Sequence, residues 1–190
     1  MLSLLCFTIT SQAQTKTEEI DFTRKSGRGI EVKKIERSGV ILLFDGGKDT
    51  INVPAFYDKK GNEEAALRMY YGNILIIKGI NGKIKEVRFW LVTKVSDKWF
   101  STLKEDKDGA IPLNPDRKGI AIWESSGNGV GSIVFTTSRG TQARIKKIEV
   151  TYEIDRVILT ISAARHATLY YSDKAFTIPQ GVVARTYKIE

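Results

Sequence analysis

The side chains best suited to catalysis are scarce in this chain. His166 is the only histidine and Cys6 the only cysteine among 190 residues. A Ser-His-Asp triad would have to use His166, and no Gly-x-Ser-x-Gly elbow accompanies it. A zinc site would have one imidazole and otherwise carboxylates, which is atypical. We therefore expect no catalytic residue, no metal site and no cofactor.

An acidic loop at Glu105–Ile111 has some features of a calcium-binding loop. Aligning Gly109 with the invariant glycine of an EF-hand places Lys104 at the first ligand position and Pro115 at the last. Both positions require oxygen ligands, so the sequence excludes an EF-hand. We interpret the segment as a solvated loop, with a looser calcium site as the alternative.

Aromatic side chains beside polar groups are the strongest binding candidates. Sugars stack their apolar faces on such rings, while neighbouring polar groups bond the hydroxyls. The alternative is that these rings lie in the core or cover a sheet edge, since tryptophan is usually well buried. The candidate ligand-binding residues are Trp90, Arg88, Tyr57, Tyr70 and Trp99.

The formal net charge is +8, without a run of five basic residues. Such a charge favours acidic partners, including polyanionic glycans and anionic cell surfaces. Solvated strand faces and protected sheet edges also explain scattered lysines and arginines, and we favour that interpretation. Because the uncharged N-terminal segment predicts export, we expect no nucleic-acid partner.

The N-terminal segment predicts export. Residues 1–14 carry no charge and are mostly apolar up to Ile9, and Ser11-Gln12-Ala13 resembles a cleavage site. We expect residues 1–13 to be a signal peptide whose basic start lies upstream, with a secreted or cell-surface mature protein. The alternative is a buried first strand. No apolar run reaches about 18 residues, so we expect no transmembrane segment.

Alternating apolar residues predict an all-β fold, an antiparallel β-sandwich over residues 20–153. Asn81-Gly82 predicts a hairpin between two of its strands. Only Asn62–Met69 predicts a helix, a turn or two with Asn62 as its cap. The other predicted strands are Gly39–Phe44, Thr50–Val53, Asn73–Lys78, Lys83–Thr93, Gly119–Glu124, Ser132–Thr137 and Arg144–Glu153.

A weak internal repeat relates Gly82–Phe89 to Ala143–Val150. Both copies read basic-Ile-Lys-x-apolar-charged-apolar, and both follow a strand and a turn. The spacing interrupts strict alternation, which predicts a bulge or a strand entry in each copy. Two equivalent hairpins of a sandwich would produce this pattern.

Residues 156–190 predict a second, smaller β unit. Four short strands are expected in it, at Arg156–Ser162, Thr168–Tyr171, Ala175–Ile178 and Val182–Ile189. The last of them reaches Glu190 without a turn or cap, so we expect this β module to be incomplete.

Several segments share a recognisable strand pattern, and they are Ala66–Asn73, Gly82–Phe89, Trp123, Ser132–Thr136 and Arg144–Tyr152, then Ile161–Ala164, Ala167–Pro179 and Gly181 in the tail. The segments before the tail resemble a β-sandwich domain of exported, surface-associated proteins of Bacteroides-type bacteria. The tail is similar to the start of a short β module typical of the same proteins, although Arg165-His166 stands where that pattern has Gly-Tyr. The resemblance implies a jelly-roll-like sandwich at the cell surface and no catalytic residues.

Fold alone does not determine function, so three hypotheses follow. The first is a non-catalytic binding or adhesion module at the cell surface, with a glycan or a surface protein as its partner. The second is a structural spacer domain without a ligand of its own. The third is a small glycan-processing enzyme, which would need a pair of carboxylates close in space.

Overall fold

The computed structural model is all-β and divides into two compact units, Thr15–Glu153 and Met1–Gln14 with Ile154–Glu190. Side chains are described for the first unit and for Ala13, Gln14 and Ile154, except at residues 28, 94, 95, 98 and 99. The structure describes residues 5–24, 27–47, 51–58, 64–92, 94–95, 98–99, 101–138, 142–163, 167–171 and 174–178.

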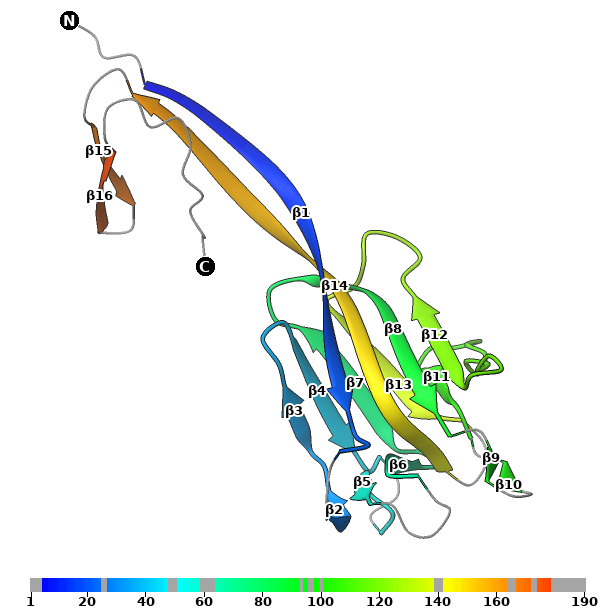
Figure 1. Cartoon of the computed structure of the whole chain (residues 1–190). Coiled ribbons are helices and arrows are strands. Elements are labelled where there is room, and N and C mark those ends of the chain that lie inside the picture. The colour runs from blue at the N-terminus through cyan, green and yellow to red at the C-terminus, as the bar shows by residue number, and fades with distance from the viewer. Residues whose placement is uncertain are drawn as a thin grey trace, which may run out of the picture. The chain divides into compact units, whose positions relative to one another are not determined.

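Two antiparallel sheets form the larger unit (Figure 1). The seven-stranded sheet has the order β12-β8-β14-β6-β5-β2, and β1 also pairs with β14. Its strands are β12 (Ile120–Glu124), β8 (Lys83–Leu91), β14 (Gln142–Ala163), β6 (Ala66–Tyr70), β5 (Ala55–Tyr57), β2 (Arg28–Glu31) and β1 (Leu5–Asp21).

The second sheet has five strands in the order β11-β13-β7-β4-β3. Each pair in it is antiparallel. The all-β sandwich that the sequence predicts is therefore confirmed. The strands of this sheet are β11 (Leu103–Glu105), β13 (Ser132–Thr137), β7 (Ile74–Gly79), β4 (Val40–Asp45) and β3 (Lys34–Glu36).

Alternation along the strands builds the core between the two sheets. On β8, Val87 and Phe89 are fully buried and face inward. Phe89 meets Phe135 of the opposite sheet edge-to-face, with ring centroids 5.0 Å apart. Trp123 also packs edge-to-face on Phe135, so Trp123 belongs to the core.

The predicted helix at Asn62–Met69 is wrong where the structure describes it. Ala66–Tyr70 is strand β6, and no helix occurs in the described ranges. Leu67 and Met69 are fully buried at every second position, so pairing and core packing override the helical propensity of this segment. Asn62 and Glu63 lie outside the described residues.

The strand predicted at Thr50–Val53 is also wrong where it is described. Ile51, Asn52 and Val53 lie outside the strands, and Ile51 is 87% exposed. Thr50 lies outside the described residues. Ile51 gives this short loop the alternating pattern of a strand, although its side chain is not in the core.

The predicted hairpin at Asn81-Gly82 is wrong as well. β7 pairs with β13 and β4, whereas β8 pairs with β12 and β14 in the other sheet. The turn therefore carries the chain from one sheet to the other. The connection from β13 to β14 crosses in the same way.

The internal repeat occupies two neighbouring strands. Val87 pairs with Val150 and Phe89 with Ile148, so the two copies lie antiparallel to each other in one sheet. The register shifts at Lys85 and at Lys146, which are equivalent positions of the repeat. The predicted bulges are therefore confirmed. The carbonyl of each bulge residue accepts a hydrogen bond from a neighbouring segment. Lys85 O accepts from Ser125 N, and Lys146 O accepts from Phe22 N, both at 2.8 Å.

The smaller unit contains a two-stranded antiparallel sheet, β15 (Ala167–Tyr171) with β16 (Lys174–Ile178). These strands match two that the sequence predicts. β14 continues to Ala163 and so includes the strand predicted at Arg156–Ser162. The strand predicted at Val182–Ile189 lies outside the described residues, as does His166.

Residues 5–13, which the sequence analysis assigns to a signal peptide, lie in β1. A strand at this position is what the alternative interpretation expects. The burial of side chains 5–12 is not described. In the described residues there is no helix long and apolar enough to cross a membrane.

Tyr152 joins the two sheets at one end of the sandwich. Its side chain, on β14, is 1% exposed and lies over Gly39, in the turn between β3 and β4. A Cβ at Gly39 would lie 1.9 Å from the Tyr152 Cζ and Oη atoms, so only glycine fits under the ring. The Tyr152 hydroxyl donates to Glu18 Oε1 at 3.3 Å, and the Ser38 hydroxyl donates to the same oxygen. We call this arrangement the Tyr152 clamp.

The clamp predicts that Gly39→Ala is strongly destabilising. The added methyl group must displace a buried ring, which costs on the order of 1–3 kcal/mol. The matched control is Gly131→Ala, because a Cβ at Gly131 meets no atom within 4 Å. We expect the control to stay within about 0.5 kcal/mol of wild type in urea unfolding. Equal effects of both substitutions would contradict the clamp.

Candidate functional site

Two groups of the sequence-predicted binding residues lie on the outer face of the seven-stranded sheet. Trp90 and Arg88 lie on β8, whereas Tyr57 lies on β5 and Tyr70 on β6. β14 lies between β8 and β6 in the sheet, so the pair on β8 is separated from the two tyrosines, which lie on the adjacent strands β5 and β6. Trp99 is in β10 (Lys98–Trp99), which pairs with β9 (Lys94–Val95), and its side chain is not described.

Trp90 is half-buried beneath a lysine. The Lys147 ammonium lies 3.9 Å from the Trp90 ring centroid, a cation–π distance. Glu149 and Glu19 accept from Lys147 Nζ at 2.7 and 3.1 Å. The hydrogen bond that Lys147 donates to Glu149 is the main cause that raises the pKa of Lys147, and the one that it donates to Glu19 adds to it. A ligand that stacked on this ring face would have to displace a cation held by two carboxylates.

Arg88 is exposed but engaged with its neighbour on the same strand. Its Nε and Nη2 atoms donate to the two Glu86 carboxylate oxygens at 2.7 and 3.1 Å. This bidentate geometry satisfies the part of the guanidinium that would grip a carboxylate. The Glu86 hydrogen bonds raise the pKa of Arg88 above its ordinary value. Arg88 and Trp90 therefore both have partners within the chain.

The second group is a compact arrangement of two phenols and a guanidinium, which we call the phenol–guanidinium cluster. The Arg68 Cζ atom lies 3.9 Å from the Tyr57 ring centroid. The Tyr57 and Tyr70 hydroxyl oxygens are 3.3 Å apart. All three side chains are half-buried. The cluster consists of Tyr57, Arg68 and Tyr70.

Period-two alternation directs this cluster outward. Leu67 and Met69 on β6 fill the core, so Arg68 and Tyr70 point to the opposite face of the sheet. Tyr57 pairs with Ala66, whose small side chain leaves room for the ring. Burial raises the pKa of the Tyr70 phenol, and the hydrogen bond with Tyr57 raises it further. The Tyr70 phenol therefore stays a neutral hydrogen-bonding group near pH 7.

Asn73 positions the end of β6 that carries Tyr70. Its side chain is fully buried, and its Oδ1 accepts from Tyr70 N at 2.8 Å. Its Nδ2 donates to the carbonyls of Gly46 and Asn52 at 3.0 and 2.8 Å. Asn73 thus ties the loop after β4 to the end of β6. From sequence, Asn73 is predicted only as the first residue of a strand.

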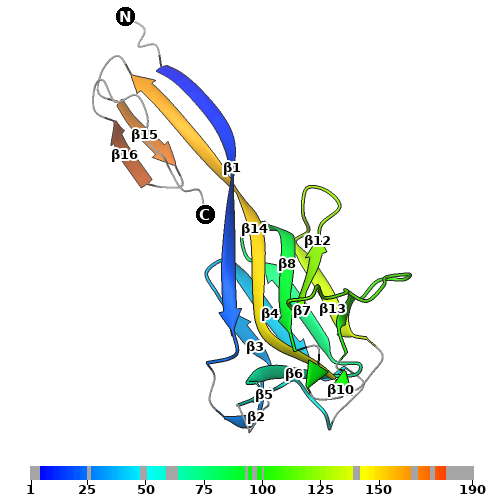
Figure 2. The same ribbon diagram turned by 45° about the vertical axis from the view of Figure 1, so that its right-hand side comes forward.

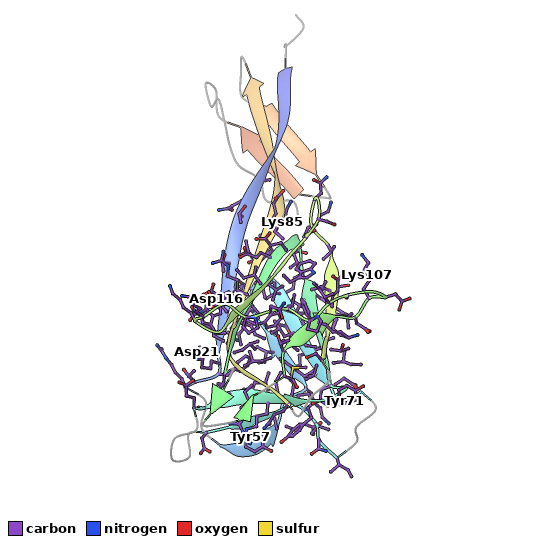
Figure 3. The ribbon with its side chains drawn as sticks, turned by 90° about the vertical axis from the view of Figure 1, so that its right-hand side faces the viewer. Asp21, Tyr57, Tyr71, Lys85, Lys107 and Asp116 are labelled. Carbon is purple, nitrogen blue, oxygen red and sulfur yellow. The ribbon has the colours of Figure 1, made fainter. Side chains whose placement is uncertain are left out.

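The cluster has an exposed aromatic neighbour and a second arginine. Tyr71 is 57% exposed, and it lies at the same end of the sandwich as Tyr57 (Figure 3). Arg144 stands directly opposite Arg68 in the register of β14 and β6, although it is only 5% exposed. Both arginines make further interactions within the chain. Sequence patterns indicate Arg88 as the binding arginine and do not indicate Arg68, because the helix that they predict hides its alternation with Leu67 and Met69.

The described residues include no group of three or more histidine, cysteine, aspartate or glutamate side chains that could hold a metal ion. In the acidic loop, the Glu105 carboxylate accepts from Trp123 Nε1 at 3.1 Å. This hydrogen bond gives Glu105 a structural role at the edge of the core.

Comparison with known proteins provides no family assignment. No protein-family model, curated protein or solved structure matches the chain.

The lysine over Trp90 predicts a change in tryptophan fluorescence. Lys147→Ala should increase acrylamide quenching, because it uncovers one face of the Trp90 ring. The same substitution in a Trp90→Phe background should leave quenching unchanged. Lys78→Ala, at an exposed lysine of the five-stranded sheet, provides the control. If Lys147→Ala still increased acrylamide quenching in the Trp90→Phe background, another tryptophan would be responding and the prediction would be contradicted.

Proposed function

We propose that the chain is a non-catalytic, exported binding module that recognises a glycan at the phenol–guanidinium cluster. The observation that supports this proposal is the cluster itself, in which two hydrogen-bonded phenols and a stacked guanidinium lie together outside the core. Rings with polar tips offer stacking area and hydrogen bonds, the combination that sugar recognition uses. Export and the cell-surface setting rest on the uncharged N-terminal pattern.

An acidic glycan is the preferred ligand class. Arg68 faces Arg144 across the strand pair, so two guanidinium groups lie at this position of the sheet. A carboxylate or sulfate is the kind of group that a guanidinium binds most strongly. The net charge of +8 also favours the approach of a polyanion.

A structural spacer is the second candidate. The observation that favours it is that Trp123 is in the core, Trp90 lies beneath Lys147, and Arg88 is paired with Glu86. Three polar or aromatic groups suited to a ligand are thus engaged within the chain. The Glu149 and Glu19 carboxylates, which a glycan-processing enzyme could use, both accept hydrogen bonds from Lys147 Nζ.

A charge-matched pair of variants tests the glycan proposal. We expect wild type to bind polygalacturonate or alginate more tightly than neutral xylan in calorimetric titration. Arg68→Gln should weaken binding by about tenfold or more, since it removes the guanidinium from the cluster. Arg88→Gln removes the same charge from the same sheet face outside the cluster, and should have a much smaller effect.

Two results would contradict the glycan proposal. Equal loss in both variants would indicate a diffuse charge effect without a defined site. A failure of folded wild type to bind any acidic or neutral polysaccharide on an array would favour the spacer. Urea unfolding of each variant confirms that the fold is intact.

A further inference from the structure

A hollow of about 380 Å³ opens between the two sheets on the side where β3 forms the edge. Its apolar lining includes Ile20 and Val32, which are nearly fully buried, and the half-buried Ile35 and Phe56. Ile30, which pairs with Phe56, is 52% exposed. Side chains that face the core are therefore left partly open to solvent at this edge (Figure 2 shows β3 beside β4).

The backbone of β3 directs hydrogen-bonding groups outward along the same edge, where the Glu36 carbonyl already accepts from Arg37 Nη1 at 3.0 Å. Arg37 N donates to Val40 O, and Phe44 N donates to Lys33 O, each at 2.9 Å. In an antiparallel ladder these bonds alternate, so the backbone groups of Lys34 and Glu36 point away from β4. In the described part of the chain, β3 has β4 as its one strand neighbour. Such an edge is a template for a further strand.

The charged side chains around the hollow determine which charge an added strand of a partner should carry. Lys33, Lys34 and Arg37 line it together with Glu31 and Glu36. Ion pairs join Lys33 to Glu31 at 3.6 Å and Lys34 to Glu36 at 2.6 Å. The rim thus keeps a net positive charge, in a chain of net charge +8. A second copy of the chain would bring the same cations, whereas an acidic segment complements them.

We propose that the β3 edge docks an extended, acidic segment of a partner protein. The segment adds to β3 as an antiparallel or parallel strand and places an apolar side chain in the hollow. Backbone hydrogen bonds to the Lys34 N–H and carbonyl and to the Glu36 N–H supply affinity, while the hollow and the cationic rim supply selectivity. The site is independent of the proposed glycan site, because Phe56 faces the core whereas Tyr57 faces outward.

The first test uses two fluorescein-labelled ten-residue peptides, one alternating Asp with Val and one alternating Lys with Val. We expect the Asp–Val peptide to bind at micromolar to sub-millimolar concentration, as followed by fluorescence anisotropy. The Lys–Val peptide should bind at least about tenfold more weakly. Binding should also slow hydrogen exchange at the Lys34 and Glu36 amides, measured by NMR. Absence of Asp–Val binding at millimolar peptide, or equal binding of both peptides, would overturn the proposal.

The second test removes one edge donor without breaking the ladder. Lys34→Pro deletes an outward-facing N–H and should weaken Asp–Val binding by about tenfold or more. The matched control is Ile122→Pro, which deletes an outward-facing N–H of β12 at the opposite edge of the other sheet. Its binding should equal that of wild type, and equal losses in the two variants would refute the assigned edge. If Lys34→Pro fails to fold, Arg37→Glu reverses an exposed rim charge and should reduce Asp–Val binding several-fold.

Discussion

The sandwich depends on the packing of one tyrosine against two glycines. Tyr152 belongs to the seven-stranded sheet, and its ring lies over Gly39 in the turn of the other sheet. A Cβ at Gly82 would lie 3.2 Å from Tyr152 Cδ2 and 2.6 Å from the Glu153 carbonyl oxygen. The backbone of the turn that follows β7 is therefore also held close to the ring. The Ile80 amide donates to the Gly39 carbonyl at 3.0 Å, which joins the two turns.

The polar end of Tyr152 explains why a tyrosine is suited to this position. Its hydroxyl has a partner in the Glu18 carboxylate, which also accepts from Ser38. Burial raises the pKa of the Tyr152 phenol, and the nearby Glu18 charge raises it further. The phenol therefore stays neutral over the ordinary pH range. One side chain thus links β14 and β1 to the β3–β4 turn of the opposite sheet.

Much of the fold follows from alternation, and the errors have physical causes. The core faces of β8 and β14 are evident in sequence because their strands bury every second residue against a packed sheet. The partner of each strand is not evident, because Asn81-Gly82 forms a turn whether the chain returns within one sheet or crosses to the other. β6 was mistaken for a helix, since Ala66, Leu67 and Met69 favour helix locally and only pairing with β14 and β5 reveals the strand.

The candidate site was predictable in part. Tyr57 and Tyr70 were named from sequence, and the structure places their hydroxyls 3.3 Å apart. Arg68 was missed because its outward direction is defined only once β6 is a strand. Trp90 and Arg88 lie on the outer face, and their partners Lys147 and Glu86 depend on cross-strand register and on rotamers. Sequence patterns thus indicate which face a side chain occupies better than they indicate what covers it.

A double-mutant cycle between Gly39→Ala and Tyr152→Leu tests the clamp most directly. The free energy of unfolding would be measured by urea denaturation for wild type, both single variants and the double variant. If the Tyr152 ring is what excludes a side chain at Gly39, the cost of Gly39→Ala should fall by more than half when residue 152 is leucine. The coupling energy should then be about 1 kcal/mol or more. Additive costs, with a coupling energy near zero, would contradict the account.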